Sequence, residues 1–395
     1  MLSTAAQRLA LIGETGARVV RPRPMRSRPL VSVVIPCYNY GRYLPGCVAS
    51  VLGQPDVDIE VVIVDDASPD GSAETVRRLV AGDPRMRAIY HETNQGHITT
   101  YNDGLATVRG EYLVLLSADD LLVPGALGRA TALMEAHPSV GLAYGATVDF
   151  TDTPPPARTE ATTWTVWAGQ DWLANRCRRG RNPLLSPEAV MRTSVYQKLG
   201  GYRADLPHAA DLAMWLGAAM VSDVGYVGGA DQAYYRVHAQ SMSKSVNAGW
   251  VIDLQQRLRT FDVTLGEASR SAETAALLAA AHRALARQAL GHAIDAWVSA
   301  AGRAATPDDA GRRGVESHRD SATPDDGTEA LVENLVDVAM SADPDATRLP
   351  EWRVLRRIRG RSGGALRRSP SFRVRQSTRD LTDRVRWRRW RRAGV

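Results

Sequence analysis

Two adjacent aspartates, Asp119 and Asp120, follow the apolar start of the segment YLVLLSADDLLVP, which spans residues 112–124. An apolar run of this length predicts a buried strand, and the end of such a strand is an unfavourable place for two unpaired charges. Paired carboxylates suit a divalent cation such as Mg²⁺ or Mn²⁺, which prefers oxygen ligands. The alternative is that one of them caps a helix that opens at Pro124.

Four apolar, β-branched runs predict strands at residues 31–36, 59–66, 86–91 and 111–116. A helical stretch follows each run: to about residue 54, at 71–82, near 97–108 and from 124 onward. Strands that alternate with helices and are apolar on both faces indicate a parallel sheet covered on both sides. Polar residues follow three of the runs, as CYN, DDAS and SADD. Because ligands bind beyond the carboxyl ends of parallel strands, we expect these residues to converge on one ligand-binding edge.

Taken together, the motifs resemble those of the family 2 glycosyltransferases, which have the GT-A fold. The resemblance covers about residues 31–245 and rests on an ordered set of segments: VSVVIPCYNYGRYL, VVIVDDASPDGS, NQGHITTYNDGLATVRGEYLVLLSADDLLVP, LGGY, HAADLAMWLG and YYRVHAQSMS. It implies an α/β fold in which helices flank a mixed, mostly parallel sheet, followed here by a C-terminal helical extension. It also implies an inverting transfer of sugar from a nucleoside-diphosphate sugar.

The resemblance assigns the ends of the first two strands to the nucleotide. Pro36 and Tyr38 match positions that line the nucleobase pocket, and Asp66 matches the carboxylate that hydrogen-bonds the base, with Asp65 beside it. The alternatives are core packing for Tyr38 and a simple turn for the two acids. Four further positions match the family's loop positions: Asn94, Gly96, Asn102 and Gly104.

The same resemblance makes Asp119 the metal ligand. Ser117 stands where the family's first acid is expected, so Asp119 carries most of the charge offered to Mg²⁺ or Mn²⁺, and Asp120 either orients it or caps the helix. His238 matches a position that supplies a further metal or diphosphate contact in some members, although a lone histidine is more often structural. Arg236 is suited to pair with a phosphate.

Asp211 is the candidate general base. It occupies the place of the family's catalytic acid in HAADLAMW, where its neighbour is Ala210 rather than a second acid. Inverting transfer is a single displacement, so the acceptor hydroxyl must lose its proton as the new bond forms. The alternative is that Asp211 caps the following helix. Tyr101 is a departure, because many members have an arginine there that helps to bind the donor.

The chain is divided by pattern into five parts. Residues 1–30 are an N-terminal extension, and 31–249 are the GT-A-like domain, with a nucleotide-binding half at 31–150 and an acceptor half at 151–249. Within the acceptor half we expect a helix near 209–220 and a short strand at VGYVG. The predicted remainder is a helical extension at 250–301, a flexible linker at 302–327 and a helical, basic tail at 328–395.

Charge is concentrated at the end of the chain. Residues 351–395 hold 16 arginines against three acids, a net charge of +13; the whole chain is +6, so residues 1–350 carry −7. No nucleic-acid-binding motif accompanies this tail, so we expect no nucleic-acid partner. Arginine with tryptophan, as in VRWRRWRR, suits the headgroup layer of an anionic membrane. A solvated tail is the alternative.

Composition is consistent with a cytoplasmic protein. No run of about 18 apolar residues is present, the N-terminus lacks a secretion signal, and the three cysteines have no CxxC spacing. We therefore expect a location in the cytoplasm, peripheral to the inner face of the cell membrane if the tail docks there.

The expected function is transfer of a sugar to a hydroxyl acceptor, which is a carbohydrate, a lipid-linked molecule or a small molecule. Such reactions belong to the biosynthesis of cell-envelope polysaccharide, glycolipid or secondary metabolites. The rival is a non-catalytic nucleotide-sugar-binding or scaffold protein of the same fold, which would be expected to lose Asp119 or Asp211. A dehydrogenase is disfavoured because no GxGxxG follows the first strand.

Overall fold

The computed structural model describes residues 15–238, 246–266, 271–303 and 326–359. These residues fall into two compact units. The first contains residues 15–176 and 182–238, and the second contains residues 177–181 together with the described residues from 246 onward.

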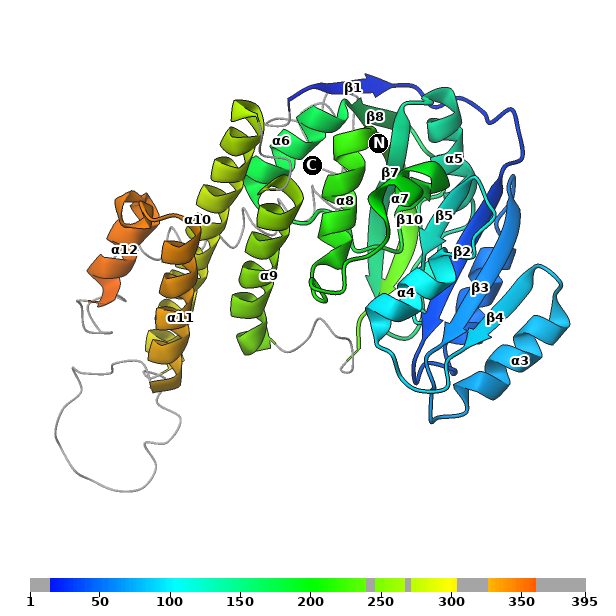
Figure 1. Cartoon of the computed structure of the whole chain (residues 1–395), viewed down its shortest axis with the longest axis horizontal. Coiled ribbons are helices and arrows are strands. Elements are labelled where there is room, and N and C mark those ends of the chain that lie inside the picture. The colour runs from blue at the N-terminus through cyan, green and yellow to red at the C-terminus, as the bar shows by residue number, and fades with distance from the viewer. Residues whose placement is uncertain (1–14, 239–245, 267–270, 304–325, 360–395) are drawn as a thin grey trace. The chain divides into compact units, whose positions relative to one another are not determined.

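The first unit is built on one ten-stranded sheet (Figure 1). The strands are β1 (Ala17–Val20), β2 (Leu30–Cys37), β3 (Asp58–Asp65), β4 (Met86–Tyr90), β5 (Tyr112–Leu115), β6 (Leu121–Leu122), β7 (Val140–Phe150), β8 (Thr163–Trp167), β9 (Val190–Arg192) and β10 (Asp223–Arg236). Their order across the sheet is β1-β8-β10-β7-β9-β5-β2-β3-β4, and β6 pairs with β10.

The four predicted strands are β2, β3, β4 and β5, and they pair in parallel in the order β5-β2-β3-β4. β2 is buried on both faces, because the successive residues Val33 and Val34 are both fully buried. This burial explains why the strands are continuous apolar runs rather than alternating ones. The predicted fold class, a mixed and mostly parallel sheet flanked by helices, is confirmed.

Helices cover both faces of this sheet. They are α2 (Leu44–Leu52), α3 (Ser72–Gly82), α4 (His97–Leu105), α5 (Ala126–Ala136), α6 (Gly169–Arg179), α7 (Thr193–Leu199) and α8 (Ala210–Val221). Side chains of α2, α3 and α5 share one core with alternate residues of β2 and β3. On the opposite face, α4 packs against Val34 and Val64.

The carboxyl-terminal half of the unit also contributes residues to the edge of the sheet at which β5 ends. β9 lies between β5 and β7 and is antiparallel to both. The strand expected only at VGYVG is the 14-residue β10, which is parallel to β7 and continues past β6 to Arg236. Because β10 is longer than its apolar core, it carries the polar segment YYR to the end of β5.

Two helix starts differ from the sequence expectation. The helix expected to open at Pro124 begins at Ala126, after Gly125 in the left-handed conformation. The helix after DDAS begins at Ser72 with Gly71 as its N-cap, although Asp70 still accepts the Ser72 N–H at 3.0 Å. In both places a glycine with positive φ makes the turn that the helix entry needs.

The second unit is helical. It contains α9 (Val246–Gly266), α10 (Ala272–Arg303), α11 (Asp326–Ala342), the short 3₁₀ helix η2 (Ala346–Arg348) and α12 (Pro350–Arg359). α10 packs against α9, α11 and α12. Most of the predicted linker, residues 304–325, and the tail from residue 360 lie outside the described residues. Among the described helices, none has the length and apolarity needed to cross a bilayer.

Gly104 is a point of close contact between α4 and the sheet. A Cβ added there would meet Val34 Cγ1 at 2.4 Å and Val64 Cγ2 at 2.9 Å. Gly104→Ala is therefore expected to lower the free energy of unfolding by about 1–3 kcal/mol, the usual effect of overpacking a core. Urea denaturation measures this change.

The matched control is Gly82→Ala at the end of α3, where an added Cβ meets nothing within 4 Å. Alanine is favoured over glycine in helices by at most about 1 kcal/mol, so this variant should be neutral or slightly stabilised. Equal unfolding free energies for the two variants would contradict the close contact at Gly104.

Candidate active site

Asp119 and His238 meet at the carboxyl end of β5. The Oδ2 atom of Asp119 lies 3.0 Å from His238 Nε2, and both side chains are largely buried. The rings of Tyr40 and Tyr43 lie 5.7 and 5.9 Å from the His238 ring, measured between centroids. The continuation of β10 therefore brings together two predicted residues that are 119 positions apart in the chain.

Asp120 is turned to the backbone of β10. Its Oδ1 accepts the Arg236 N–H at 2.8 Å, and the residue is 1% exposed. Burial, with the charge of Asp119 adding, raises the pKa of Asp120 well above its usual range. The suggestion that Asp120 caps the next helix is wrong, because α5 starts after Gly125 without a side-chain cap.

Arg236 is held by main-chain oxygens. Its Nε donates to the carbonyl of Asp119 at 2.9 Å, and its Nη1 donates to the carbonyl of Thr151 at 2.7 Å. The guanidinium also lies over the rings of Tyr43 and Phe150, at 4.7 and 4.2 Å. Arg236 thus fixes the loop that carries both aspartates.

The donor atoms at this edge fit a cation only in part. Within the described part of the chain, no group of three or more His, Cys, Asp or Glu side chains is arranged to hold a metal ion. Asp119 and His238 offer one oxygen and one nitrogen, while Ser117 uses its carbonyl to accept the N–H of Asp120. Mg²⁺ commonly takes one or two carboxylates and completes its shell with water and substrate phosphates. Two protein donors are compatible with such a shell.

Asp66 is fully engaged within the protein. Its Oδ1 lies 2.7 Å from His91 Nδ1 and accepts the Gln95 N–H at 2.8 Å, while its Oδ2 accepts the Gly96 N–H at 3.0 Å. Although burial opposes ionisation, these hydrogen bonds lower the pKa of Asp66. His91 extends the network to Asp103 on α4, with its Nε2 at 3.1 Å. Asp66 therefore anchors the loop before α4.

Asp65 has a spare acceptor at the same edge. Its Oδ2 accepts the Ser68 N–H at 3.4 Å, but its buried Oδ1 has no hydrogen-bond partner among the described residues. The buried Oδ1 of Asn39 is in the same situation. Tyr38, which follows Pro36 and β2, is 45% exposed, so it is not packed in the core. Of the two predicted base-binding acids, Asp65 retains the unused oxygen.

The predicted loop residues have identifiable structural partners. Asn94 Nδ2 donates to the carbonyl of Asp66 at 3.4 Å, and Gly96 precedes α4 with a φ of 82°. Asn102 on α4 makes two hydrogen bonds with the backbone of Tyr202, one in each direction, both of 2.8 Å. Gly201 permits this approach, since a Cβ there would meet Asn102 Oδ1 at 2.9 Å.

Asp211 lies in the first turn of α8, where a negative charge is favoured by the helix dipole. Its Oδ2 accepts a hydrogen bond from Asn182 Nδ2 at 2.8 Å. The N-cap of α8 is Ala209, so Asp211 is not the capping residue. Burial raises the pKa of Tyr101, and the charges of Asp211 and Asp119 add to this effect. Tyr101 therefore lies within electrostatic reach of both the predicted base and the predicted metal ligand.

Two polar residues of this edge escaped the sequence interpretation. His91 follows β4 and bridges Asp66 to Asp103, and Glu188 precedes β9. Burial, with the charge of Asp211 adding, raises the pKa of Glu188 from an ordinary 4.5 to about 7. The sequence signal for Glu188 is that this acid directly precedes the apolar residues AVM. Asp119 also lies next to an apolar run but follows it, so the two arrangements are only weakly similar.

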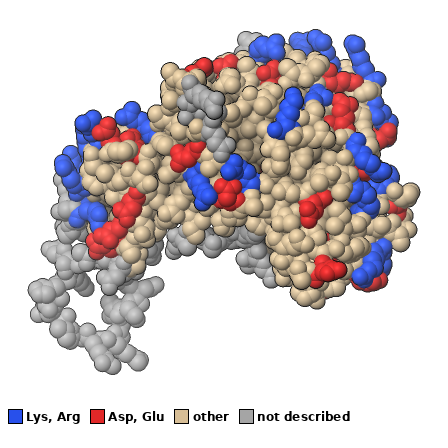
Figure 2. Space-filling model, in the orientation of Figure 1, with Lys and Arg blue, Asp and Glu red and all other residues tan. Residues whose placement is uncertain are grey.

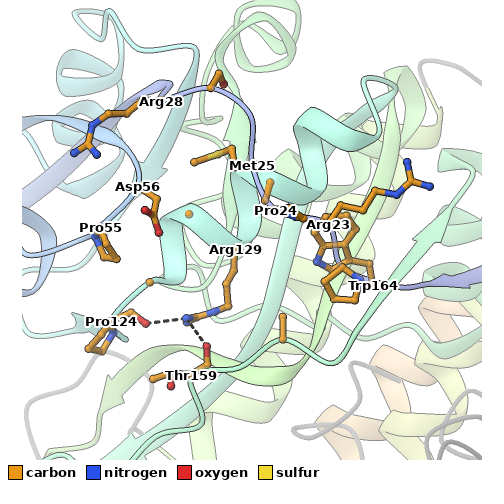
Figure 3. Close-up of a pocket in the computed structure, with 16 residues that line it drawn as sticks. Arg23, Pro24, Met25, Arg28, Pro55, Asp56, Pro124, Arg129, Thr159 and Trp164 are labelled. Carbon is orange, nitrogen blue, oxygen red and sulfur yellow. Dashed lines mark hydrogen bonds between the residues drawn. The ribbon is translucent and has the colours of Figure 1, made fainter.

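A separate pocket of about 710 Å³ is lined by none of the predicted site residues (Figure 3). Asp56, which lies two residues before β3 begins, is part of its wall, so the pocket lies near the amino end of that strand. Arg129 points across it and donates to the carbonyls of Pro124 and Thr159, at 2.8 and 3.0 Å. Because Arg129 is held in this way, it serves to join the walls of the pocket.

Comparison with known proteins identifies similar sequences and folds. The family model "Glycosyl transferase family 2" matches residues 32–200. An uncharacterized protein of Mycobacterium tuberculosis is 31% identical over 221 residues, which are 51% of this chain and 65% of that protein. The glycosyltransferase GlyG of Streptococcus pneumoniae is 38% identical over 93 residues, which are 24% of this chain and 31% of that protein. The chain thus spans less than two thirds of either relative.

The crystal structure of TarS from S. aureus has a similar fold. It superposes with a TM-score of 0.50 at 18% sequence identity, covering 82% of this chain and 55% of that chain. At this identity the likeness concerns the fold, and it agrees with the predicted fold class.

The buried carboxyl of Glu188 predicts a pH dependence of stability. Because its pKa is higher in the folded protein, the folded protein retains a proton between about pH 4.5 and 7 that the unfolded chain releases. The contribution of Glu188 is fully present below about pH 4.5 and is lost as pH rises through about 7, by up to about 3 kcal/mol. Glu188→Gln should therefore lose less stability than the wild type between pH 5 and pH 8, measured by urea denaturation.

Glu60→Gln is the matched control, because Glu60 is equally buried but its carboxylate accepts hydrogen bonds from Ser32 and Arg109. Those hydrogen bonds lower the pKa of Glu60 although burial opposes them, so its own pH dependence falls below about pH 4.5. Parallel stability curves for Glu188→Gln and the wild type would contradict the raised pKa.

Proposed function

Since the chain carries a glycosyl transferase family 2 domain at residues 32–200, we propose that it transfers a sugar from a nucleoside-diphosphate sugar to a hydroxyl acceptor with inversion. The observation that carries this proposal is the position of Tyr101, on which the charges of Asp119 and Asp211 both act. Asp119 is suited to the cation on a leaving diphosphate, and Asp211 is suited to an incoming hydroxyl. Both carboxylates are therefore within electrostatic reach of the same residue, Tyr101.

The nucleotide would bind at the ends of β2 and β3. Tyr38 offers an exposed ring beside Pro36, and Asp65 offers an unused buried acceptor to a base N–H. Asp66 has a supporting role in this proposal, because its oxygens already hold His91 and the loop at Gln95 and Gly96. The donor sugar would lie beside Tyr101.

Mg²⁺ or Mn²⁺ is the proposed cofactor, held by Asp119 and His238. The ion would neutralise charge on the departing diphosphate as a Lewis acid. Asp120 orients this pair indirectly, since its carboxylate and the Nε of Arg236 join the aspartate loop to β10 by two hydrogen bonds.

Asp211 is the proposed general base. Its carboxylate accepts the proton of the acceptor hydroxyl while the hydroxyl oxygen forms the new bond to the anomeric carbon. The bond from that carbon to the diphosphate oxygen breaks at the same time, and the diphosphate leaves with the electron pair. Asn182 holds one oxygen of Asp211 and so orients the carboxylate. General-base assistance contributes about 10²–10⁴ in rate.

The proposed acceptor is a carbohydrate, a lipid-linked molecule or a small molecule with a free hydroxyl. Enzymes of this family often use lipid-linked or envelope-bound acceptors, so we place the reaction in envelope polysaccharide, glycolipid or secondary-metabolite synthesis.

A basic surface supports docking to an anionic membrane in the cytoplasm. Arg353, Arg356 and Arg357 are exposed on α12, and the arginine-rich residues 360–395 follow it outside the described residues. Figure 2 shows basic side chains gathered where α12 lies in Figure 1, with acidic ones beside them. Arginines near an anionic bilayer contribute about 1 kcal/mol each.

The enzymatic proposal is tested with Asp211→Asn. A thermal-shift panel of UDP-, GDP- and TDP-sugars with and without Mn²⁺ identifies the nucleotide that stabilises the wild type. The variant should keep that stabilisation and lose transfer by about 10²–10⁴-fold, because it removes the base and leaves the nucleotide edge intact. Transfer is followed as release of nucleoside diphosphate.

Asp58→Asn is the control, because Asp58 is an exposed acid at the amino end of β3, paired with Arg28. It should match the wild type in both measurements. If no nucleotide stabilises the wild type with or without Mn²⁺, the enzymatic proposal is overturned and the scaffold alternative fails with it.

The membrane proposal is tested by co-sedimentation with phosphatidylglycerol vesicles. Deletion of residues 360–395 removes 12 of the 16 arginines and spares α12, whose Leu355 and Ile358 are buried. The deletion should weaken binding strongly at low salt, and neither form should bind phosphatidylcholine vesicles. Equal binding of the two forms to the anionic vesicles would exclude docking through the tail.

A further inference from the structure

Glu188 lies at the ligand-binding edge because of the direction of β9. Met191 of β9 pairs with Leu113 of β5 and with Leu142 of β7, antiparallel in both cases. The residues that precede β9 therefore lie beside those that follow β5. Glu188 comes two residues before β9 begins at Val190. It is thus placed near the loop that carries the aspartate pair, although it is far from that loop in sequence.

The carboxyl group of Glu188 is only half satisfied. The residue is 3% exposed, and its Oε1 accepts the Leu185 N–H at 2.8 Å. Its buried Oε2 has no hydrogen-bond partner among the described residues. A buried polar atom without a partner is destabilising, and an apolar residue of similar size would avoid that cost. Packing alone therefore does not account for a glutamate here.

The titratable groups that face Glu188 come from three elements. Asp211 of α8 acts on Glu188 through its charge, and Glu188 in turn acts on Asp120 in the loop after β5 and on Tyr226 of β10. All three are acids, and no basic side chain is among the groups whose charge acts on Glu188. Glu188 is therefore a carboxyl within electrostatic reach of both the proposed base and Asp120.

The segment that carries Glu188 also holds Asp211. Asn182 donates to Asp211 Oδ2 at 2.8 Å, and its own Oδ1 accepts the Leu184 N–H at 3.2 Å. Ser186 then turns the chain with a φ of 91°, a conformation that a residue other than glycine adopts only under constraint. One strained segment thus places an amide on Asp211 and a carboxyl within electrostatic reach of it.

We propose that Glu188 is a positioning residue for sugar transfer, which supplies from the loop before β9 the second carboxyl beside Asp211 that α8 lacks at Ala210. This inference rests on the proposed transferase function. Glu188 acts through Asp211 and does not contact the substrates.

The physical effect is that of a neighbouring like charge. An ionised Glu188 disfavours a second negative charge nearby, so Asp211 gains more by accepting a proton. The proton comes from the acceptor hydroxyl and ends on Asp211, the oxygen of the hydroxyl bonds to the anomeric carbon, and the nucleoside diphosphate leaves with the electron pair. Glu188 exchanges no proton in this step.

The test compares Glu188→Gln, Glu188→Asp and Glu60→Gln in the full chain. The probe is the UDP-, GDP- or TDP-sugar that most stabilises the wild type with Mn²⁺, with release of the diphosphate followed from pH 5.5 to 9. We expect Glu188→Gln to release diphosphate about 10–100-fold more slowly, as for other residues that orient a reacting group. Its thermal stabilisation by the nucleotide should equal that of the wild type.

The pH profile separates positioning from simple stability. The wild-type rate should rise through about pH 7, where Glu188 ionises, and Glu188→Gln should lack this rise. Glu188→Asp keeps the charge and should regain part of the rate and the rise. Glu60→Gln, which loses buried hydrogen bonds elsewhere, should be less stable and keep the wild-type profile.

Two results would overturn the inference. A wild-type rate and pH profile in Glu188→Gln would remove Glu188 from the reaction and leave the proposed transferase function untouched. The same loss of rate and of the pH-dependent rise in Glu60→Gln would show that any buried glutamate produces it. A wild type that neither binds a nucleotide sugar nor releases diphosphate would instead overturn the proposed function, and the inference with it.

Discussion

Two adjacent carboxylates at the end of a buried strand have to be compensated, and much of the first unit is arranged to do so. Asp120 is almost fully buried and is satisfied by a backbone N–H, that of Arg236. That N–H is available because β10 pairs with β6 only at Ala233 and Tyr234 and then continues beside β7 as far as Arg236. The same strand then brings His238 to Asp119. The length of β10 therefore lets one strand supply a partner to each of the two aspartates.

The parallel half of the sheet was predictable because its signal is local. β2, β3 and β5 are apolar runs, and strands buried on both faces need that composition. The antiparallel insertion was not predictable, because β9 is three residues long and pairs with strands about 50 and 80 positions away. Glu188 was missed for this reason, since its position depends on that insertion.

The candidate site, like the sheet, was predictable only in part. The sequence identifies the edge at which Asp65, Asp66 and Asp119 gather, because strand ends in a parallel sheet meet there. It does not distinguish a carboxylate that binds ligand from one that holds the protein together. Asp66 is occupied by His91 and two N–H groups, whereas one oxygen of Asp65 has no hydrogen-bond partner in the described part of the chain. That distinction depends on hydrogen bonds between residues about 25 to 30 positions apart, which carry no local pattern.

The two hydrogen bonds between Asn102 and Tyr202 have a mechanical consequence. They join α4, which begins after Gly96, to the segment that leads into α8 and Asp211. Asn102 and Tyr202 each donate one hydrogen bond and accept one, and Gly201 packs closely against Asn102. This contact therefore resists both sliding and separation of the two segments. These two hydrogen bonds consequently hold α4 and the segment before α8 in a fixed relation. A movement of α4 relative to the start of α8 would therefore require the chain to bend at a place other than these two residues.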